Sequence, residues 1–221
     1  MPTDSAGGNG ITNEKSIAAL LLIDVINDLE FPGGEELLPP ALQAAQAIAG
    51  LKDRCKRAGI PAIYINDNFG RWQSDFRKLV EHCVDDPVRG REIARLLRPD
   101  EDRDYFVLKP KHSGFFSTTL DTLLDHLGAR KLIIAGFTAD SCVLFTAGDA
   151  YMRDYELFVP ADCVASEDPA ENQRELLHMQ RVLKANIQRG DELDLVELKR
   201  EVSESAEQAR PEPQAPRFAS E

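Results

Sequence analysis

The sequence predicts a three-layer α/β/α domain built on a parallel sheet, and three observations support this class. Short apolar runs alternate along the chain with longer amphipathic stretches, as in strands joined by crossover helices. The runs are continuous in Val, Ile and Leu, which indicates strands buried on both faces. Hydrophobic residues make up 43% of the 221 residues, enough for one sizeable core. Helices must therefore cover both sides of the sheet.

The apolar runs predict where the strands lie. Five runs are clear, and a sixth run is weaker than these. The expected strands are residues 17–25, 62–66, 105–108, 131–136 and 156–160, with the weaker one at 194–198.

Four helices are expected between and after these strands. The first has apolar residues at helical spacing, with Pro40 in its first turn and Gly59 after its last. The long connection 67–104 is expected to be irregular with two short helices, and long connections in compact domains tend to carry function. The expected helices are residues 40–57, 120–127, 140 or 141 to 153, and 170–188, with the short ones at 76–83 and 91–97.

Composition limits the domain and its partners. The folded domain is expected at residues 15–199, with a flexible tail at 1–14 and a disordered acidic, Pro-rich tail at 200–221. The formal net charge of −12 argues against nucleic acid or an anionic membrane as a partner. No apolar run approaches the ~20 residues of a membrane span. A small-molecule partner is therefore expected.

Cysteine usage favours a reducing compartment. The four cysteines lie far apart, with no C-x-x-C pair and no secretory leader ahead of them. We therefore expect free thiols and a cytoplasmic location. The cysteines are Cys55, Cys83, Cys142 and Cys163.

In an open parallel sheet, chemistry is expected beyond the carboxyl ends of the strands. Asp24, Lys109 and Cys142 follow three of the expected strands. Cys142 also opens a helix, where the helix dipole and free N–H groups stabilise a thiolate. We expect Lys109 to lower the pKa of this thiol further and Asp24 to accept its proton. The backbone N–H groups of Thr138 and Cys142 are candidates to hold an oxyanion.

Each of these residues also has an ordinary structural explanation. A single cysteine is more often a small core residue, and an Asp after a strand is often a turn or cap residue. Lys109 could simply be a solvated lysine. The occurrence of all three residue types at successive strand ends favours a site, whereas Cys55, Cys83 and Cys163 are expected to be structural.

A set of motifs runs from about Ala18 to Ala165. It comprises Leu21-Leu22-Ile23-Asp24 with Asn27-Asp28, Lys109-Pro110-Lys111-His112-Ser113-Gly114-Phe115, Gly136-Phe137, Cys142-Val143 with Thr146-Ala147, and Asp162-Cys163-Val164-Ala165. With these motifs the chain resembles the isochorismatase-like cysteine hydrolase family, which includes nicotinamidases and related amidases.

The resemblance implies a catalytic triad of Asp24, Lys109 and Cys142 on a six-stranded Rossmann-like sheet of order 3-2-1-4-5-6. It also implies a non-proline cis peptide bond between Phe137 and Thr138, which turns an N–H group into the oxyanion hole. Because family members commonly form dimers or tetramers, a homo-oligomer is expected.

One departure from the family concerns metal binding. In the family that this chain resembles, nicotinamidases hold a metal through histidines that follow the second strand. The equivalent residues of this chain, 66–72, contain no histidine. Asp67 alone cannot hold a transition metal, which needs three or four ligands. We therefore expect no metal and no other cofactor, and the stretch argues against nicotinamidase activity.

The sequence thus predicts a hydrolase that cleaves a small amide or similar C–N bond. Asp24 is expected to take the proton of Cys142, pass it to the leaving amine and then activate the water that hydrolyses the thioester. Lys109 is expected to stabilise the thiolate. The expected substrate pocket consists of Asn66, Asp67, Phe69, Trp72 and His112.

Two alternatives stay open. An isochorismatase-like vinyl-ether hydrolase would use the acid and would need no cysteine nucleophile, so the presence of Cys142 argues against it. A non-catalytic binding or thiol-redox domain would keep the fold without hydrolysis. The pH dependence of thiol alkylation distinguishes this last alternative from an activated nucleophile.

Overall fold

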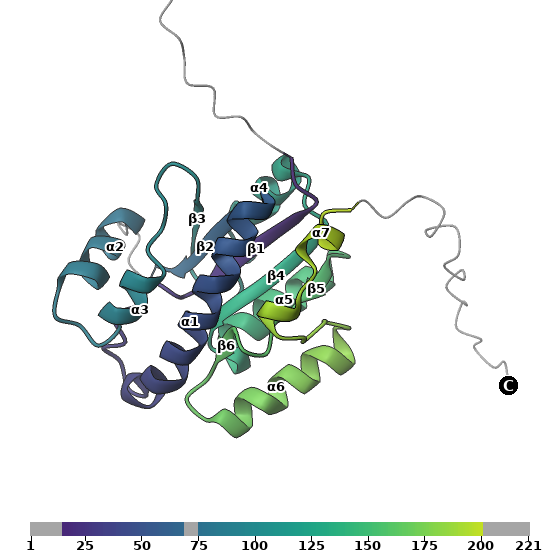
Figure 1. Ribbon diagram of the computed structural model, residues 1–221. Coiled ribbons are helices and arrows are strands. Elements are labelled where there is room, and N and C mark those ends of the chain that lie inside the picture. Colours follow the sequence, from purple (N-terminus) through teal and green to yellow (C-terminus); the bar gives the residue numbers. More distant parts are fainter. Residues whose placement is uncertain (1–14, 69–74, 201–221) are drawn as a thin grey trace, which may run out of the picture.

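The computed structural model describes residues 15–68 and 75–200 as a six-stranded parallel sheet with helices on both sides (Figure 1). The predicted fold class is therefore confirmed. The predicted tails, residues 1–14 and 201–221, lie outside the described residues, and the domain limits stay a prediction. The strands are β1 (Ala18–Ile23), β2 (Ala62–Asp67), β3 (Tyr105–Lys109), β4 (Lys131–Phe137), β5 (Glu156–Phe158) and β6 (Val164–Ala165).

The strands lie in the order β3-β2-β1-β4-β5, and β6 pairs with β4. Strand β5 pairs with the first residues of β4, from Lys131 to Ile133, and β6 pairs with the last two, Gly136 and Phe137. The expected order 3-2-1-4-5-6 is therefore wrong at its last strand. The reason is length: β5 has three residues and β6 has two, so each covers only part of the seven-residue β4.

The weak strand expected at residues 194–198 is also wrong. Residues Leu195–Leu198 form helix α7, because the side chain of Asp194 accepts hydrogen bonds from the N–H groups of Val196 and Glu197, both at 3.0 Å. This is an N-cap, which commits the following residues to a helix. An apolar run as short as this one fits a strand or a helix equally well from sequence alone.

Two helical layers bury separate apolar clusters against the sheet. Leu37, Phe76 and Ile93 belong to the cluster under α1, α2, α3 and α7. Leu124 and Ala147 belong to the cluster under α4, α5 and α6. The helices of the described ranges are α1 (Gly34–Ala58), α2 (Phe76–Asp85), α3 (Arg91–Leu96), α4 (Leu120–Leu127), the π-helical turn η1 (Ala139–Val143), α5 (Leu144–Tyr151), α6 (Pro169–Val182), the 3₁₀ turn η2 (Gly190–Glu192) and α7.

The expected helices are all present; α4 has the expected bounds, and the others differ at one or both ends. Helix α1 begins earlier than expected, at Gly34. Helix α6 ends at Val182 rather than at residue 188, because Asn186 returns to the sheet. Its N–H donates to the carbonyl of Leu157 at 2.8 Å, and its carbonyl accepts from the N–H of Val159 at 2.7 Å. These bonds remove residue 186 from any helix.

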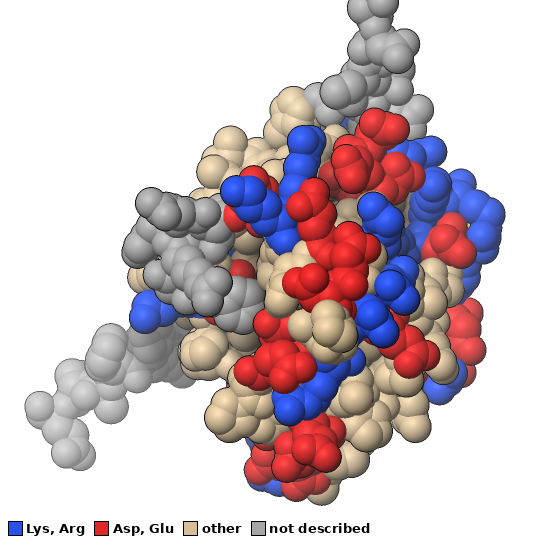
Figure 2. All heavy atoms as spheres, turned by 90° about the vertical axis from the view of Figure 1, so that its left-hand side faces the viewer, with Lys and Arg blue, Asp and Glu red and all other residues tan. Residues whose placement is uncertain are grey.

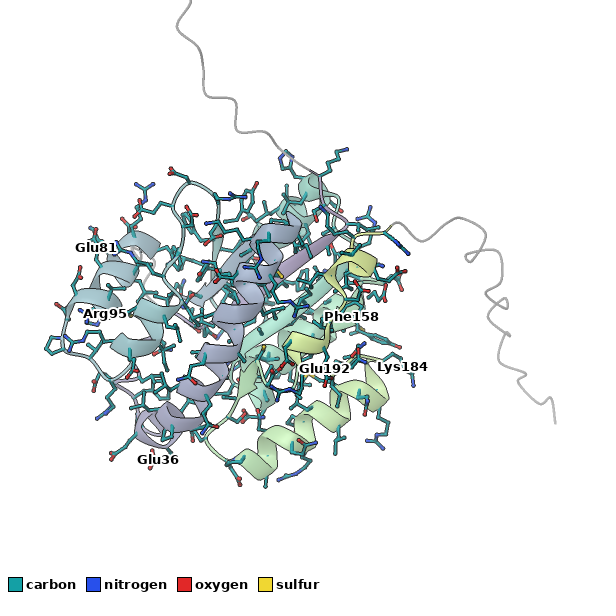
Figure 3. The ribbon with its side chains drawn as sticks, viewed as in Figure 1. Glu36, Glu81, Arg95, Phe158, Lys184 and Glu192 are labelled. Carbon is teal, nitrogen blue, oxygen red and sulfur yellow. The ribbon has the colours of Figure 1, made fainter. Side chains whose placement is uncertain are left out.

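Helices α2 and α3 lie at the β3 side of the sheet, where Glu81 and Arg95 mark them in Figure 3, and Phe158 and Lys184 lie on the other side. Figure 2 looks onto the α2 and α3 side and shows acidic and basic side chains mixed over it. No helix of the described ranges is long and apolar enough to span a membrane.

Strands β1 and β4 approach each other closely at Gly136, and substitution of this glycine tests the packing. Its φ is +127°, and a Cβ atom there would lie 2.0 Å from the backbone oxygen of Ile23. We expect Gly136→Ala to lower the free energy of unfolding in urea by at least about 2 kcal/mol. Gly50→Ala is the control, because a Cβ atom at Gly50 meets nothing within 4 Å, and it should stabilise α1 by ~0.5–1 kcal/mol. Equal effects of the two changes would contradict this packing.

Candidate active site

The carboxyl ends of β1 and β3 and the turn after β4 bring the three predicted catalytic side chains together. Nζ of Lys109 lies 2.9 Å from Oδ2 of Asp24. The same Nζ lies 3.4 Å from Sγ of Cys142. Asp24 and Cys142 are also close enough for each side chain to shift the pKa of the other. A carboxyl group, an ammonium and a thiol therefore share one small site.

Asp24 leaves β1 in a left-handed backbone conformation, with φ of +51°. This conformation costs an L-residue about 1 kcal/mol, so its surroundings must hold it. The N–H of Asp24 donates to the carbonyl of Ile65 at 2.9 Å. Its Oδ1 accepts from the N–H of Asp67 at 2.7 Å. Both bonds tie Asp24 to β2 and leave Oδ2 for Lys109.

Lys109 is fully buried at the end of β3. A buried ammonium is stable only beside opposite charge, which Asp24 supplies at 2.9 Å and Asp67 at 3.5 Å. Burial by itself lowers the pKa of Lys109, but the attraction of Asp24, Cys142 and Asp67 outweighs it and the pKa is raised. Lys109 therefore keeps its charge in the folded protein.

The pKa of the Cys142 thiol is raised to about 12. Burial is the largest cause, and the charge of Asp24 adds to it, whereas Lys109 lowers this pKa. The expected net lowering of the thiol pKa is therefore wrong: Lys109 acts in the expected direction, but burial and the carboxylate outweigh it. Burial also raises the pKa of Asp24, against the lowering effect of Lys109. The resting site thus holds a neutral thiol beside a carboxyl group of raised proton affinity.

Cys142 lies in the turn η1, which follows a cis peptide bond between Phe137 and Thr138. The carbonyl of Thr138 accepts hydrogen bonds from the N–H groups of Ser141, at 3.3 Å, and Val143, at 3.1 Å. These are the amides on either side of Cys142, so the turn is fixed around this cysteine. An oxyanion hole made by the N–H groups of Thr138 and Cys142 stays a prediction.

Two buried hydroxyl groups that the sequence reasoning did not single out support this turn. Oγ of Ser166 accepts from the N–H of Ala139 at 3.0 Å. Oγ1 of Thr146 donates to the carbonyl of Cys142 at 2.7 Å and accepts from the N–H of Gly114 at 3.0 Å. Thr146 belongs to the motifs behind the family resemblance, and this was the only signal that could have found it.

The five expected pocket residues have different positions. Asp67 and His112 lie beside the predicted triad. Oδ2 of Asp67 is 3.5 Å from Nζ of Lys109, and Nδ1 of His112 is 3.7 Å from Sγ of Cys142. Asn66 is fully buried, and its side-chain amide donates to a carbonyl of the loop after β1 at 2.7 Å. Phe69 and Trp72 lie outside the described residues. Within the residues that are described, no three His, Cys, Asp or Glu side chains are placed to hold a metal ion.

Fold and site together define an α/β enzyme with a buried carboxyl group, a buried amine and a partly exposed thiol at the carboxyl edge of its sheet. Residues 18–189 match the family described as Isochorismatase domain. The chain therefore belongs to the isochorismatase family.

Individual relatives agree with this assignment. The uncharacterized isochorismatase family protein YaaI of Bacillus subtilis is 42% identical over 173 residues, which cover 78% of this chain and 94% of YaaI. The structure of N-carbamoylsarcosine amidase from Thermoplasma acidophilum has a TM-score of 0.61 and 29% identity, covering 80% of this chain and 98% of that one. Pyrazinamidase/nicotinamidase from Streptococcus mutans has a TM-score of 0.62 and 28% identity, with 77% and 99% covered. These relatives place the chain among small-molecule hydrolases.

The raised pKa of Cys142 predicts slow alkylation at neutral pH. Because the thiolate is the reacting form, the rate with iodoacetamide should rise about tenfold per pH unit from about pH 7 to 9, without the plateau of a free thiol. Asp24→Asn removes a charge that raises this pKa, so alkylation at about pH 8 should become about tenfold faster. The measurement is the mass of the labelled Cys142 peptide.

The matched control is Asp125→Asn, because the Asp125 side chain is 73% exposed and its ion pair is with Arg130 on the surface. This control should leave the alkylation rate unchanged. A plateau below about pH 8.5 in the wild-type protein would contradict the raised pKa.

Proposed function

We propose that this protein is a cysteine hydrolase that cleaves a small amide, or a similar C–N bond, through a thioester on Cys142. The observation that carries the proposal is the contact of one buried ammonium, that of Lys109, with both a carboxyl group and a sulfur. The distances are 2.9 Å to Asp24 and 3.4 Å to Cys142. A base, a cation and a thiol in contact are the arrangement that activates a cysteine nucleophile.

The first half of the proposed reaction forms the thioester. As the sulfur attacks the substrate carbonyl, the thiol proton passes to Asp24. Burial raises the proton affinity of this carboxyl group. Lys109 stabilises the negative charge that develops on the sulfur as the S–C bond forms. The C=O electron pair moves to oxygen, where the N–H groups of Thr138 and Cys142 hold the oxyanion. With a thiol pKa of about 12, proton transfer accompanies attack rather than preceding it.

The second half releases the products and restores the thiol. The oxyanion collapses, the C–N bond breaks with its electron pair on nitrogen, and the nitrogen leaves with a proton donated by an acid group of the site. Water then attacks the thioester carbonyl and gives one proton back to that same group, and the C–S bond breaks. The sulfur of Cys142 regains the proton that Asp24 has held, so both side chains return to their starting state.

The relatives support a C–N bond as the target. Two of the similar structures are named as amidases, N-carbamoylsarcosine amidase and pyrazinamidase/nicotinamidase. Residues 66–72 lack the histidines with which the resemblance associates nicotinamidase metal binding. We therefore favour a carbamoyl compound or a simple amide over a pyridine carboxamide as substrate.

Vinyl-ether hydrolysis is the second candidate, because the matching family is named for isochorismatase. This reaction would need Asp24 as an acid and would leave the sulfur of Cys142 without a role. The contact of Lys109 with that sulfur favours the thioester route. A non-catalytic binding or thiol-redox domain is the third candidate, and the activities of the wild type and of a Cys142→Ala variant separate all three.

The setting of the enzyme is part of the proposal. All four cysteines are free, which fits a reducing cytoplasm. We also propose a dimer or tetramer of this chain acting on a small molecule, without nucleic acid or membrane. Size-exclusion chromatography with light scattering measures the oligomeric state, and a monomer at micromolar concentration would contradict that part.

A screen of small amides and carbamoyl compounds for release of ammonia or amine tests the function. We expect one of them to be hydrolysed and to leave an acyl adduct on Cys142 that mass spectrometry detects. Cys142→Ala should lower kcat by at least ~10³-fold and abolish the adduct. Cys83→Ala, which truncates a buried thiol of the α2 layer, is the control and should keep the activity. Full activity of Cys142→Ala would exclude the thioester route.

A further inference from the structure

The sulfur of Cys142 has two chemically different sides. On the inner side lie fully buried Lys109, at 3.4 Å from Sγ, and Asp24, which is 8% exposed. On the solvent side lies the exposed ring of His112, with Nδ1 at 3.7 Å from Sγ. A substrate that enters from solvent therefore meets the sulfur on the side of His112, and its reacting atoms lie within reach of that imidazole.

His112 is held in this position by several contacts. Its Nδ1 lies 3.1 Å from Oγ of Ser141, and its ring packs against Phe145 with 5.6 Å between ring centres. The next residues are anchored to α5: Ser113 hydrogen-bonds the carboxylate of Asp149, and the N–H of Gly114 donates to Thr146 at 3.0 Å. The imidazole thus sits on a fixed segment rather than on a free loop.

Asp24 is poorly placed to act on that outer side. Its Oδ1 accepts from the N–H of Asp67 at 2.7 Å, and its Oδ2 contacts Lys109 at 2.9 Å. Both oxygens are engaged from within the protein, and Asp24 is only 8% exposed, whereas Cys142 is partly exposed. Asp24 is suited to exchange one proton with the sulfur, whereas a group leaving on the outer side needs another proton source.

We propose that His112 is a second catalytic acid–base residue, which protonates the leaving nitrogen and later deprotonates the hydrolytic water. This inference rests on the proposed hydrolase function. The sequence analysis assigned all proton transfers to Asp24, whereas here they are divided between Asp24 and His112. Imidazole is the side chain best able to give and take a proton near neutral pH.

The proton balance closes over one cycle. In acylation, the thiol proton goes to Asp24, the S–C bond forms, the C–N bond breaks, and the nitrogen takes a proton from the His112 imidazolium. In deacylation, the neutral imidazole takes a proton from water as the new C–O bond forms. The C–S bond then breaks, and the sulfur of Cys142 takes its proton back from Asp24. The site returns to an imidazolium, a carboxylate and a thiol.

The proposal predicts a dependence on the leaving group. Ammonia leaves an amide only with an added proton, whereas p-nitrophenolate leaves an ester without one. With acetamide and p-nitrophenyl acetate as probes, His112→Asn should slow acetamide hydrolysis by about 10²-fold. The p-nitrophenolate burst, which reports acylation of Cys142, should keep its rate within about twofold, and the steady state after the burst should slow because deacylation loses its base.

Two further variants complete the experiment. His112→Phe keeps a ring against Phe145 but carries no proton, so it should behave like His112→Asn. His126→Asn is the matched control, because His126 lies in the last turn of α4, away from the site. The carbonyl of the next residue, Leu127, accepts a hydrogen bond from the N–H of Ser16, which precedes β1, so this end of α4 lies at the opposite edge of the sheet. This control should leave the rates measured with both probes unchanged.

Failure of this proposal and failure of the proposed function give different results. Equal slowing of burst and amide hydrolysis in His112→Asn, or no change in either, would overturn the acid–base role of His112 while Cys142 still acylates. A wild-type protein without a burst, matching Cys142→Ala, would overturn the hydrolase function itself.

Discussion

The structure depends on one buried ammonium group. Lys109 is fully buried, and its charge is stable there only because Asp24 lies at 2.9 Å and Asp67 at 3.5 Å. The parallel pairing of β2 with β3 sets Asp67 opposite Lys109, and the left-handed backbone of Asp24 directs its carboxyl group to the same point. Cys142 then meets a cation that the sheet has already fixed in place.

Much of the fold and the core of the site could be predicted, since both follow from apolar runs and from the polar residues that end them. Asp24, Lys109 and Cys142 stood at strand ends, and a parallel sheet gathers strand ends at one edge. The errors lie where local chemistry decides. Residues 195–198 are a helix because of the cap at Asp194, and β6 has only two residues, too few to recognise as a strand.

The chemistry of the thiol could not be predicted in the same way. The sequence reasoning identified the neighbours of Cys142, but the sign of its pKa shift depends on how deeply the sulfur is buried and on the balance between Asp24 and Lys109. Burial is a property of the packed molecule. The hydroxyl groups of Ser166 and Thr146, which fix the turn around Cys142, likewise become visible only in three dimensions.

A double-mutant cycle on Asp24 and Lys109 tests the central interaction most directly. The free energies of unfolding of wild type, Asp24→Asn, Lys109→Met and the double variant would be measured in urea at about pH 7. Lys109→Met alone should cost about 3 kcal/mol, because it leaves a buried carboxylate without its partner, and the double variant should recover a large part of that loss. Strictly additive effects would show that the ammonium and the carboxylate do not depend on each other, and would contradict this account.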